Sequence, residues 1–380
     1  MTLPRLASRA LLAASLTLAA ASALGATYRV PSQVPTIQGA LNMSLPGDSV
    51  LVAPGTYLEN LAMRNGVILV GESGATTTTL DGRFLGPVIN CASVTGFTVK
   101  GLTLRRGYTG VYPGGAGIAM NLSQGAILDC VLADNHSERD GGGISFFDSQ
   151  ATIRGCTFRN NNAGVSFFLD GGGVFCYRST MLLEDCVLLD NLAHEGGGIA
   201  VVNNSSAVVR RCVVARNEAT STWPAGSGYA MTASTATIES NTFVNNVTSF
   251  GSACVFFVSS AVSFQRNIIA NSSGVGLACQ NSTATCNDVW NSANTNYSDC
   301  PPHPSNLSAD PLFCNLAALD LRLDQASPCA PDNSPAGCGL IGALGVGCGP
   351  VAVEPATWGR IKARFNGELT PAGGGPGARR

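Results

Sequence analysis

Three acidic residues occupy the same place in a recurring unit of this chain, directly before a run of glycines. They are Asp140, Asp170 and Glu195. If the units stack at the strand spacing of about 5 Å, the carboxylates lie above one another, and like charges raise the pKa of at least one of them. Such a row could bind Ca²⁺ or supply acid and base for cleaving a polysaccharide. The simpler alternative is that each acidic residue merely solvates a glycine-rich turn.

Aromatic residues cluster in and around the same glycine motifs and could form a platform for sugar rings. The residues that could be exposed beside the acidic row are Phe147, Phe168, Tyr177 and Phe257. Adjacent pairs such as Phe146-Phe147 place one ring inward and one outward when they lie on a strand. Packing in the core is the alternative for most of these rings.

Other catalytic motifs are missing from the sequence. His194-Glu195 is followed by glycines, so it does not form the paired-histidine zinc motif, and no P-loop or nucleophile elbow occurs. A lyase would need an arginine or lysine beside the carboxylates as its base, and Arg139 and Arg178 are the nearby candidates. The sequence therefore predicts no firm metal or cofactor site beyond candidate Ca²⁺ ligation by the acidic row.

The elements that position these residues follow from an internal repeat. A Gly-Gly-Gly-Ile/Val unit begins at Gly141, Gly171 and Gly196, and a second motif centred on cysteine or asparagine lies between the copies. The interval falls within the roughly 20–50 residues typical of solenoids. Apolar and polar residues alternate within each unit, which indicates short strands, and no unit has room for a helix.

The chain of 380 residues is rich in glycine, with 45 of them, and only 12% of its residues are charged. That composition suits turns and short stacked strands, because glycine destabilises helices. The pattern predicts an all-β fold, a single-stranded right-handed parallel β-helix. Pro35–Met43 has helical apolar spacing behind a proline-threonine start and is the expected N-terminal capping helix.

Two ladders of equivalent residues are expected to run along the solenoid. The first is an interior cysteine ladder of Cys130, Cys156, Cys186 and Cys212. The second is a turn ladder of Asn135, Asn161, Asn191, Asn217 and Asn246. The cysteines could form disulfides or bind metal, but a small apolar side chain also packs well inside a narrow solenoid. The asparagine amides can bond the neighbouring coil.

The two ends of the chain differ in character from the repeat. Residues 1–25 carry Arg5 and Arg9 before a short apolar run and small residues, as in a secretory signal peptide. Residues 26–275 form the expected β-helix, residues 276–349 the Cys-rich C-terminal coils and cap, and residues 350–380 a largely disordered tail that could be a sorting or attachment tag. Seven cysteines follow residue 275, so one must pair elsewhere or stay free.

Several segments resemble known families. The matching runs are Thr36-Ile37-Gln38, Pro54–Asn60, Gly71-Glu72 and Leu80-Asp81-Gly82. They are similar to the opening of pectin methylesterase-like proteins of the pectin-lyase fold, although no later methylesterase or polygalacturonase signature follows. The Gly-Gly-Gly-Ile/Val and Phe-x-x-Asn repeats of roughly residues 114–271 resemble those of chlamydial polymorphic outer-membrane proteins, which implies a surface adhesin-type role.

Together these observations favour a secreted or cell-surface bacterial protein that acts as a monomeric binding or adhesion module. The partner would be a polysaccharide or another cell-surface component. The alternative is a polysaccharide lyase or glycoside hydrolase using the acidic residues, with Asp140, Asp170 and Glu195 as catalytic candidates. The formal net charge of −2 gives no electrostatic reason to expect nucleic acid, and no transmembrane segment is expected in the mature chain.

Overall fold

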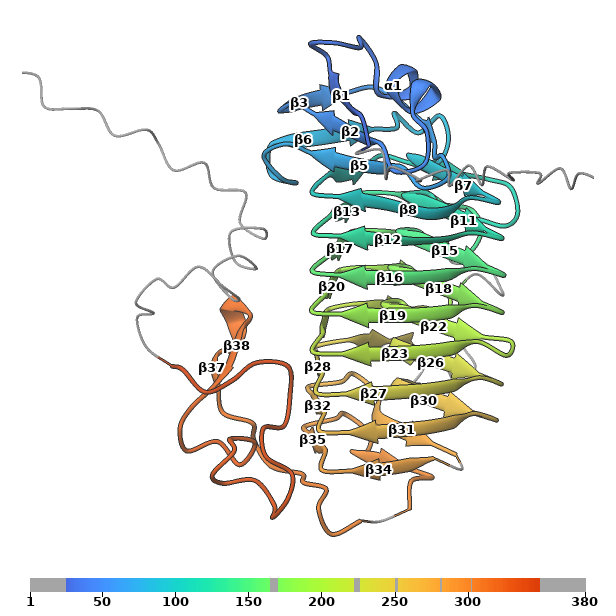
Figure 1. Ribbon diagram of the computed structural model, residues 1–380. Coiled ribbons are helices and arrows are strands. Elements are labelled where there is room, and N and C mark those ends of the chain that lie inside the picture. The colour runs from blue at the N-terminus through green and yellow to red at the C-terminus, as the bar shows by residue number, and fades with distance from the viewer. Residues whose placement is uncertain are drawn as a thin grey trace, which may run out of the picture.

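The computed structural model describes residues 25–164, 170–221, 226–249, 252–280, 282–301 and 303–348. The expected signal peptide, apart from Gly25, and the expected tail after residue 349 lie outside these ranges, as does Phe168. Within them the chain forms a right-handed parallel β-solenoid of stacked coils with very little helix (Figure 1). The predicted fold class is confirmed.

Three long parallel sheets make up the walls of the solenoid, and each coil adds one strand to each sheet. Sheet A contains β1 (Thr27–Val30), β2 (Ser49–Val52), β5 (Ile68–Gly71), β8 (Thr95–Lys100), β12 (Gln124–Leu128), β16 (Gln150–Arg154), β19 (Thr180–Glu184), β23 (Ser206–Arg210), β27 (Thr235–Glu239), β31 (Ala261–Gln265) and β34 (Thr283–Thr285). Sheet B contains β3 (Gly55–Tyr57), β6 (Thr78–Asp81), β9 (Thr103–Arg105), β13 (Val131–Ala133), β17 (Thr157–Arg159), β20 (Val187–Leu189), β24 (Val213–Ala215), β28 (Thr242–Val244), β32 (Ile268–Ala270) and β35 (Asp288–Trp290). Sheet C contains β4 (Leu61–Ala62), β7 (Ile89–Ala92), β11 (Ile118–Asn121), β15 (Ile144–Phe147), β18 (Val174–Tyr177), β22 (Ile199–Val202), β26 (Gly226–Thr232), β30 (Ala253–Val258), β33 (Val275–Cys279) and β36 (Tyr297–Ser298).

Short strands after sheet B pair between neighbouring coils before the chain enters the glycine motifs. They are β10 (Tyr108–Thr109), β14 (His136–Ser137), β21 (Leu192–Ala193), β25 (Glu218–Ala219) and β29 (Val247–Thr248). Side chains alternate along each main strand, so that Ile144 and Phe146 of β15 are buried inside while Phe147 faces outward. The interior of the solenoid is one continuous apolar core.

The N-terminal end is covered by α1 (Ile37–Met43), at the top of Figure 1. The Thr36 side chain accepts a hydrogen bond from the Gly39 amide, and the Glu59 carboxylate accepts from the Ile37 and Gln38 amides. These acceptors satisfy N–H groups that a helix start leaves free. A strand, β1, precedes the helix and pairs with β2.

In the turns of the coils, a residue in the left-handed backbone conformation, with positive φ, precedes a buried ladder residue. Cys130, Cys156, Cys186 and Cys212 lie between sheets A and B, where the Cys130 and Cys156 amides donate to the sulfur of the next coil at 3.4 Å. Asn241, Asn267 and Asn287 continue this row.

The second expected row, Asn135, Asn161, Asn191, Asn217 and Asn246, lies at the turn after sheet B. Each Oδ1 from Asn161 onward accepts from the backbone amide of the preceding coil, for example Asn161 N to Asn191 Oδ1 at 3.0 Å. Each Nδ2 reaches a carbonyl oxygen, so both ends of the buried amide are satisfied.

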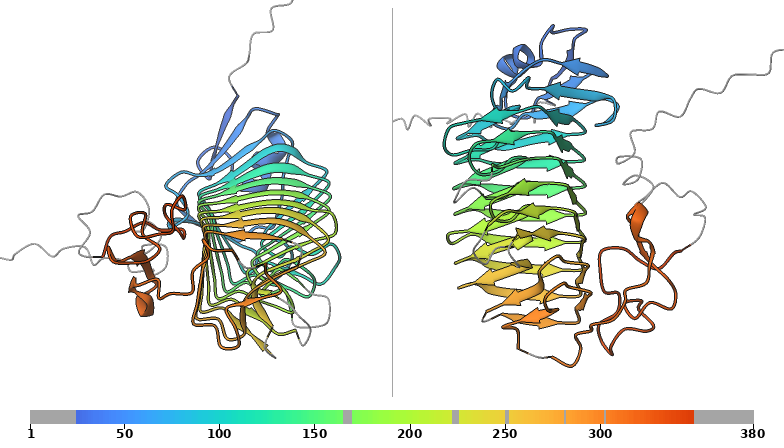
Figure 2. Two further views of the ribbon diagram at one scale, coloured as in Figure 1. Left: turned by 90° about the horizontal axis from the view of Figure 1, so that it is seen from below. Right: turned by 180° about the vertical axis from the view of Figure 1, so that it is seen from behind.

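Residues 303–348, here called the C-terminal segment, begin by adding part of one more turn, in which Leu307 forms a parallel bridge with Asp288 and Asn306 accepts from the Asn287 amide. They then turn back and pack along the outer face of sheet B, beside the stack in both views of Figure 2. The segment contains the antiparallel pair β37 (Phe313–Asn315) and β38 (Asp320–Leu323) and the 3₁₀ helix η2 (Leu316–Ala318). Its apolar side chains, among them Leu321 and Ile341, cover Val187, Val213 and Ile268 of sheet B.

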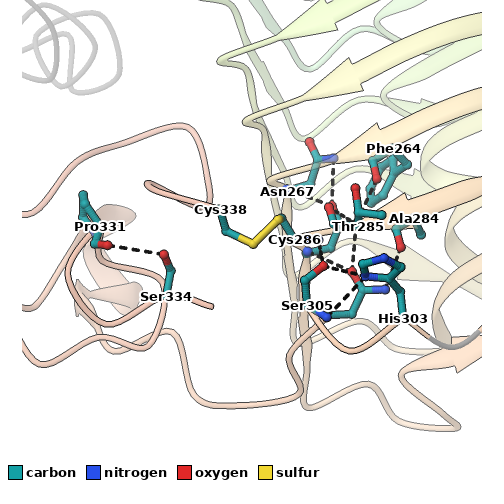
Figure 3. The surroundings of a disulfide bond; sticks show 12 residues. Phe264, Asn267, Ala284, Thr285, Cys286, His303, Ser305, Pro331, Ser334 and Cys338 are labelled. Atoms are coloured by element: carbon teal, nitrogen blue, oxygen red, sulfur yellow. Dashed lines mark hydrogen bonds between the residues drawn. A yellow bond between two sulfur atoms is a disulfide. The ribbon is translucent and has the colours of Figure 1, made fainter. Parts of the chain in front are cut away.

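Three disulfides fasten this end of the molecule. They join Cys279 to Cys300, Cys286 to Cys338 and Cys314 to Cys348. Figure 3 shows the Cys286–Cys338 bond, which ties the C-terminal segment to a turn of the solenoid. Cys329 is the member of the odd set that stays free, and it is buried. Among the helices in the described ranges, none has the length and apolar character needed to cross a membrane.

Candidate functional site

The three acidic residues that precede the glycine motifs lie in consecutive coils, in one row that we call the carboxylate stack. Asp170 forms a parallel bridge with Glu195, and its amide donates to Asp140 Oδ1 at 3.0 Å. The backbone continues the contact, because Gly141 donates to the Asp170 carbonyl and Gly171 donates to that of Glu195. The structure therefore brings Asp140, Asp170 and Glu195 together.

Glycine is required next to the stack because the chain passes close to neighbouring coils there. Gly141, Gly171 and Gly196 have φ between 60° and 70°. A Cβ at Gly142 would lie 2.6 Å from the Gly172 carbonyl oxygen, so that a larger residue would push the coils apart.

Burial dominates the electrostatics of the carboxylate stack. It raises the pKa of Asp140 to about 6. The pKa of Asp170 is raised well above its usual range, first by burial and then by the charges of Glu195 and Asp140. Burial also raises the pKa of Glu195. Asp170 Oδ1 is buried and has no hydrogen-bond partner within the described residues. Burial and mutual repulsion therefore both oppose full ionisation of the stack.

A calcium site does not follow from this geometry. Across the described ranges, no group of three or more His, Cys, Asp or Glu side chains is placed to hold a metal ion.

Aromatic rings cover the outer face of sheet C beside the stack. We call Tyr112, Phe147, Phe175 and Tyr177 the aromatic face. Phe147 packs against Tyr112, Tyr177 and Phe175 with ring centroids 4.8, 5.1 and 5.5 Å apart, respectively. Phe147 is only 3% exposed, Tyr177 is half-buried, and Tyr112 is 65% exposed. The two tyrosines thus offer accessible rings on a base of buried phenylalanines.

The aromatic face and the carboxylate stack are neighbours. The pKa of Tyr112 is raised, first by partial burial of its phenol and then by the nearby Tyr177 and Asp140. Two of the expected platform rings are not exposed. Phe147 faces outward but is covered by its aromatic neighbours, and Phe257 is fully buried inside the solenoid. Its register with Met231 makes it the inward member of its pair and leaves Phe256 facing out.

The two arginines that could serve as a lyase base are both engaged. Arg178 makes a two-point ion pair with Asp148, with Nε–Oδ1 at 2.9 Å and Nη2–Oδ2 at 2.5 Å, and its guanidinium lies 5.0 Å from the Tyr177 ring centroid. The ion pair raises the pKa of Arg178. Arg139 Nε donates to the Gly110 carbonyl oxygen at 3.4 Å. Arg178 is therefore held in its charged form, which cannot accept a proton.

The sequence matches a known protein family over more than half of its length. The family described as the right handed beta helix region matches residues 87–295, more than half of the chain. The chain belongs to this family. A metabotropic glutamate receptor-like protein R of Dictyostelium discoideum is 28% identical over 180 residues, which are 44% of this chain and 10% of that protein. The chain thus spans about a tenth of that relative's length.

Similar solved structures are β-helix proteins of low identity. A pectin methylesterase from Aspergillus niger is 12% identical, with 76% of this chain and 93% of that chain covered and a TM-score of 0.35. The mannuronan C-5 epimerase AlgE4 A-module of Azotobacter vinelandii is 13% identical, with 66% and 71% covered and a TM-score of 0.28. A family 28 exopolygalacturonase of Yersinia enterocolitica is 10% identical, with 75% and 78% covered and a TM-score of 0.30.

The ladder cysteines of this β-helix protein belong to neither the carboxylate stack nor the aromatic face. Cys130, Cys156, Cys186 and Cys212 are buried in the core without disulfides, and burial raises the pKa of the first three thiols well above the usual range. A buried neutral thiol is a poor metal ligand. Their contribution is packing and hydrogen bonding between coils.

Sequence reasoning missed two features of the site. Tyr112 lies outside the repeated motifs, and only the structure places it on Phe147. A serine ladder also fixes the turn between sheets C and A, where the amide of each coil donates to the serine hydroxyl of the next. Its members are Ser123, Ser149, Ser179, Ser205, Ser234 and Ser260. Their repeat spacing was the signal that could have identified them.

Proposed function

We propose that this β-helix protein is an exported binding module whose ligand is a polysaccharide. The observation that carries the proposal is the aromatic face, in which exposed Tyr112 and half-buried Tyr177 rest on Phe147. The apolar faces of sugar rings pack against aromatic rings, and a tyrosine hydroxyl adds a polar contact at the edge.

A rigid surface improves affinity because little ordering is needed on binding. Phe147 and Phe175 are buried against sheet C, and sheet C is continuous through ten strands. The neighbouring carboxylate stack can accept hydrogen bonds from sugar hydroxyls. The resemblance of the glycine repeats to those of polymorphic outer-membrane proteins is in keeping with a surface binding role.

The state of the two arginines supports binding over lyase chemistry. A lyase must remove a proton from the substrate, and Arg178 is paired with Asp148 while Arg139 is bonded to the backbone. A neutral or unpaired base beside the carboxylates would be needed.

Export is supported by the cysteine chemistry. Disulfides form and persist in oxidising compartments, and the described part of the chain contains three. The signal-like residues 1–25 favour the same location.

One observation favours a second candidate, a glycoside hydrolase. The raised pKa of Asp140, about 6, suits a general acid, and Glu195 and Asp170 could provide the partner carboxylate. In this alternative the stack would act on a sugar lying across the aromatic face.

The test is to incubate the full chain with a panel of insoluble neutral and acidic polysaccharides and to record both retention and new reducing ends. We expect retention without chain cleavage, and loss of retention in Tyr112→Ala and Tyr177→Ala. Phe84→Ala, which removes a 49% exposed ring in the turn after β6, is the control and should bind normally. New reducing ends that disappear in Asp170→Ala would replace the binding proposal by the hydrolase.

A further inference from the structure

A polar groove crosses the turn between sheets C and A, next to the aromatic face. Its volume is about 500 Å³, and it opens to solvent across successive coils. Two rows of side chains border it: Leu122, Asp148 and Arg178 from the turns, and Gln124, Gln150 and Thr180 from the first positions of β12, β16 and β19. All six are exposed.

The serine ladder fixes the floor of the polar groove. The Ser123 amide donates to Ser149 Oγ at 3.0 Å, and the Ser149 amide donates to Ser179 Oγ at 2.9 Å. The turn residues Leu122, Asp148 and Arg178 all have φ between 46° and 49°. Equivalent side chains are therefore presented in the same orientation from coil to coil.

The charges inside the polar groove cancel. Asp148 and Arg178 are the charged residues lining it, and they form the two-point ion pair described above. The remaining polar side chains are amides and hydroxyls, which donate and accept hydrogen bonds without charge. Such a surface matches sugar hydroxyls and offers no unpaired cation to a carboxylate or sulfate group.

The polar groove continues from the aromatic face. The Arg178 guanidinium lies over the Tyr177 ring, 5.0 Å from its centroid, so one residue borders both surfaces. The carboxylate stack on the other side of the aromatic face repels anionic polymers to the extent that it is ionised.

We propose that the polar groove is a subsite for a neutral, hydroxyl-rich glycan that lies along the solenoid axis. Gln124, Gln150 and Thr180 bond successive sugar units, and the Asp148–Arg178 pair contacts hydroxyls where the chain passes to Tyr177. The coil spacing of about 4.8 Å repeats the same groups at a regular interval, as a polymer of identical units requires. This inference rests on the proposed binding function and narrows its ligand class.

The test measures affinities of the full chain for neutral galactan and β-glucan and for acidic polygalacturonate and alginate. We expect a neutral polymer to bind at least tenfold more tightly than either acidic one. Gln124→Ala combined with Gln150→Ala should weaken neutral binding by about tenfold, the effect of losing one or two hydrogen bonds. Thr235→Ala is the matched control, because Thr235 has the equivalent place in the later coils beside a separate depression.

A charge variant gives an independent result. Asp148→Asn leaves Arg178 without its counter-charge, so binding of polygalacturonate should increase several-fold and should fall with added salt. Preference of the unmodified chain for an acidic polymer, or an unchanged neutral affinity in the double glutamine variant, would overturn the inference while leaving polysaccharide binding intact. Failure of every polymer to bind would overturn both.

Discussion

At the scale of single residues, Asp288 shows how a buried carboxyl group joins the C-terminal segment to the solenoid. It begins β35 on the outer face of sheet B and is fully buried. Its carboxylate accepts the Ala309 amide at 3.0 Å, and Cys329 Sγ lies 3.2 Å from Oδ2. Burial raises the pKa of Asp288 to about 6, with a smaller upward effect from Asp310.

The raised pKa makes the stability of this contact depend on pH. A carboxyl group that is harder to ionise when folded contributes stability that is present below pH 3.8 and is lost as the pH rises through about 6. The free energy of unfolding measured with denaturant should therefore fall across this window by up to about 3 kcal/mol because of Asp288. In Asp288→Asn, the fall in the free energy of unfolding across this pH window should be smaller by that amount.

The carboxyl groups of the carboxylate stack also have raised pKa values, so they too lower the stability as the pH rises. Both the unmodified chain and Asp288→Asn contain the stack, so the difference between their pH profiles reports Asp288. The neighbouring Cys329 and Tyr297 have pKa values raised by burial and stay neutral in this window. An identical pH profile in Asp288→Asn and the unmodified chain would contradict the assignment.

At the scale of elements, most of the C-terminal segment covers the outer face of sheet B. The outward residues Val187, Val213 and Ile268 are apolar because Leu321, Leu323 and Ile341 pack on them. Gly342 and Ala343 reach back to the coils of Arg266 and Thr242, where Gly342 donates to the Arg266 carbonyl and Ala343 to Thr242 Oγ1.

The Cys286–Cys338 disulfide should stabilise this docking. It closes a loop with a sequence separation of 52, for which a disulfide typically contributes about 2–4 kcal/mol. Replacing both cysteines by serine should make the C-terminal segment the first part to be cleaved in limited proteolysis, with the circular dichroism of the coils retained. If the variant were as stable as the unmodified chain, and the C-terminal segment and the coils were cleaved together, the disulfide would have no such role.

The sequence was sufficient for the coils because spacing alone brings equivalent residues into register, as with Cys130 and Cys156 or Asp140 and Asp170. It was not sufficient for the docking of the C-terminal segment, although the apolar run Val187–Leu189 indicated burial on both faces of that strand. Phe257 was placed wrongly because an adjacent phenylalanine pair does not reveal which ring faces inward. The register that decides this shifts between Gly226 and Tyr229.

At the scale of the whole molecule, the sides of the β-helix differ in what they carry. Sheet B is covered by the C-terminal segment, and α1 covers the N-terminal end. The outer face of sheet C and its turn into sheet A carry the aromatic face, the carboxylate stack and the polar groove. These three sets of residues come from the same few coils, so a single extended ligand could contact all of them.

Hydrogen exchange of the full chain, with and without a bound neutral polysaccharide, tests this placement most directly. Polymer binding should slow exchange in peptides that contain Tyr112, Phe147–Gln150 and Tyr177–Thr180, because the ligand excludes water and restrains these turns. Exchange in the C-terminal segment should stay unchanged. Protection confined to residues 303–348 or to the N-terminal helix would contradict the assignment of the outer face of sheet C as the binding surface.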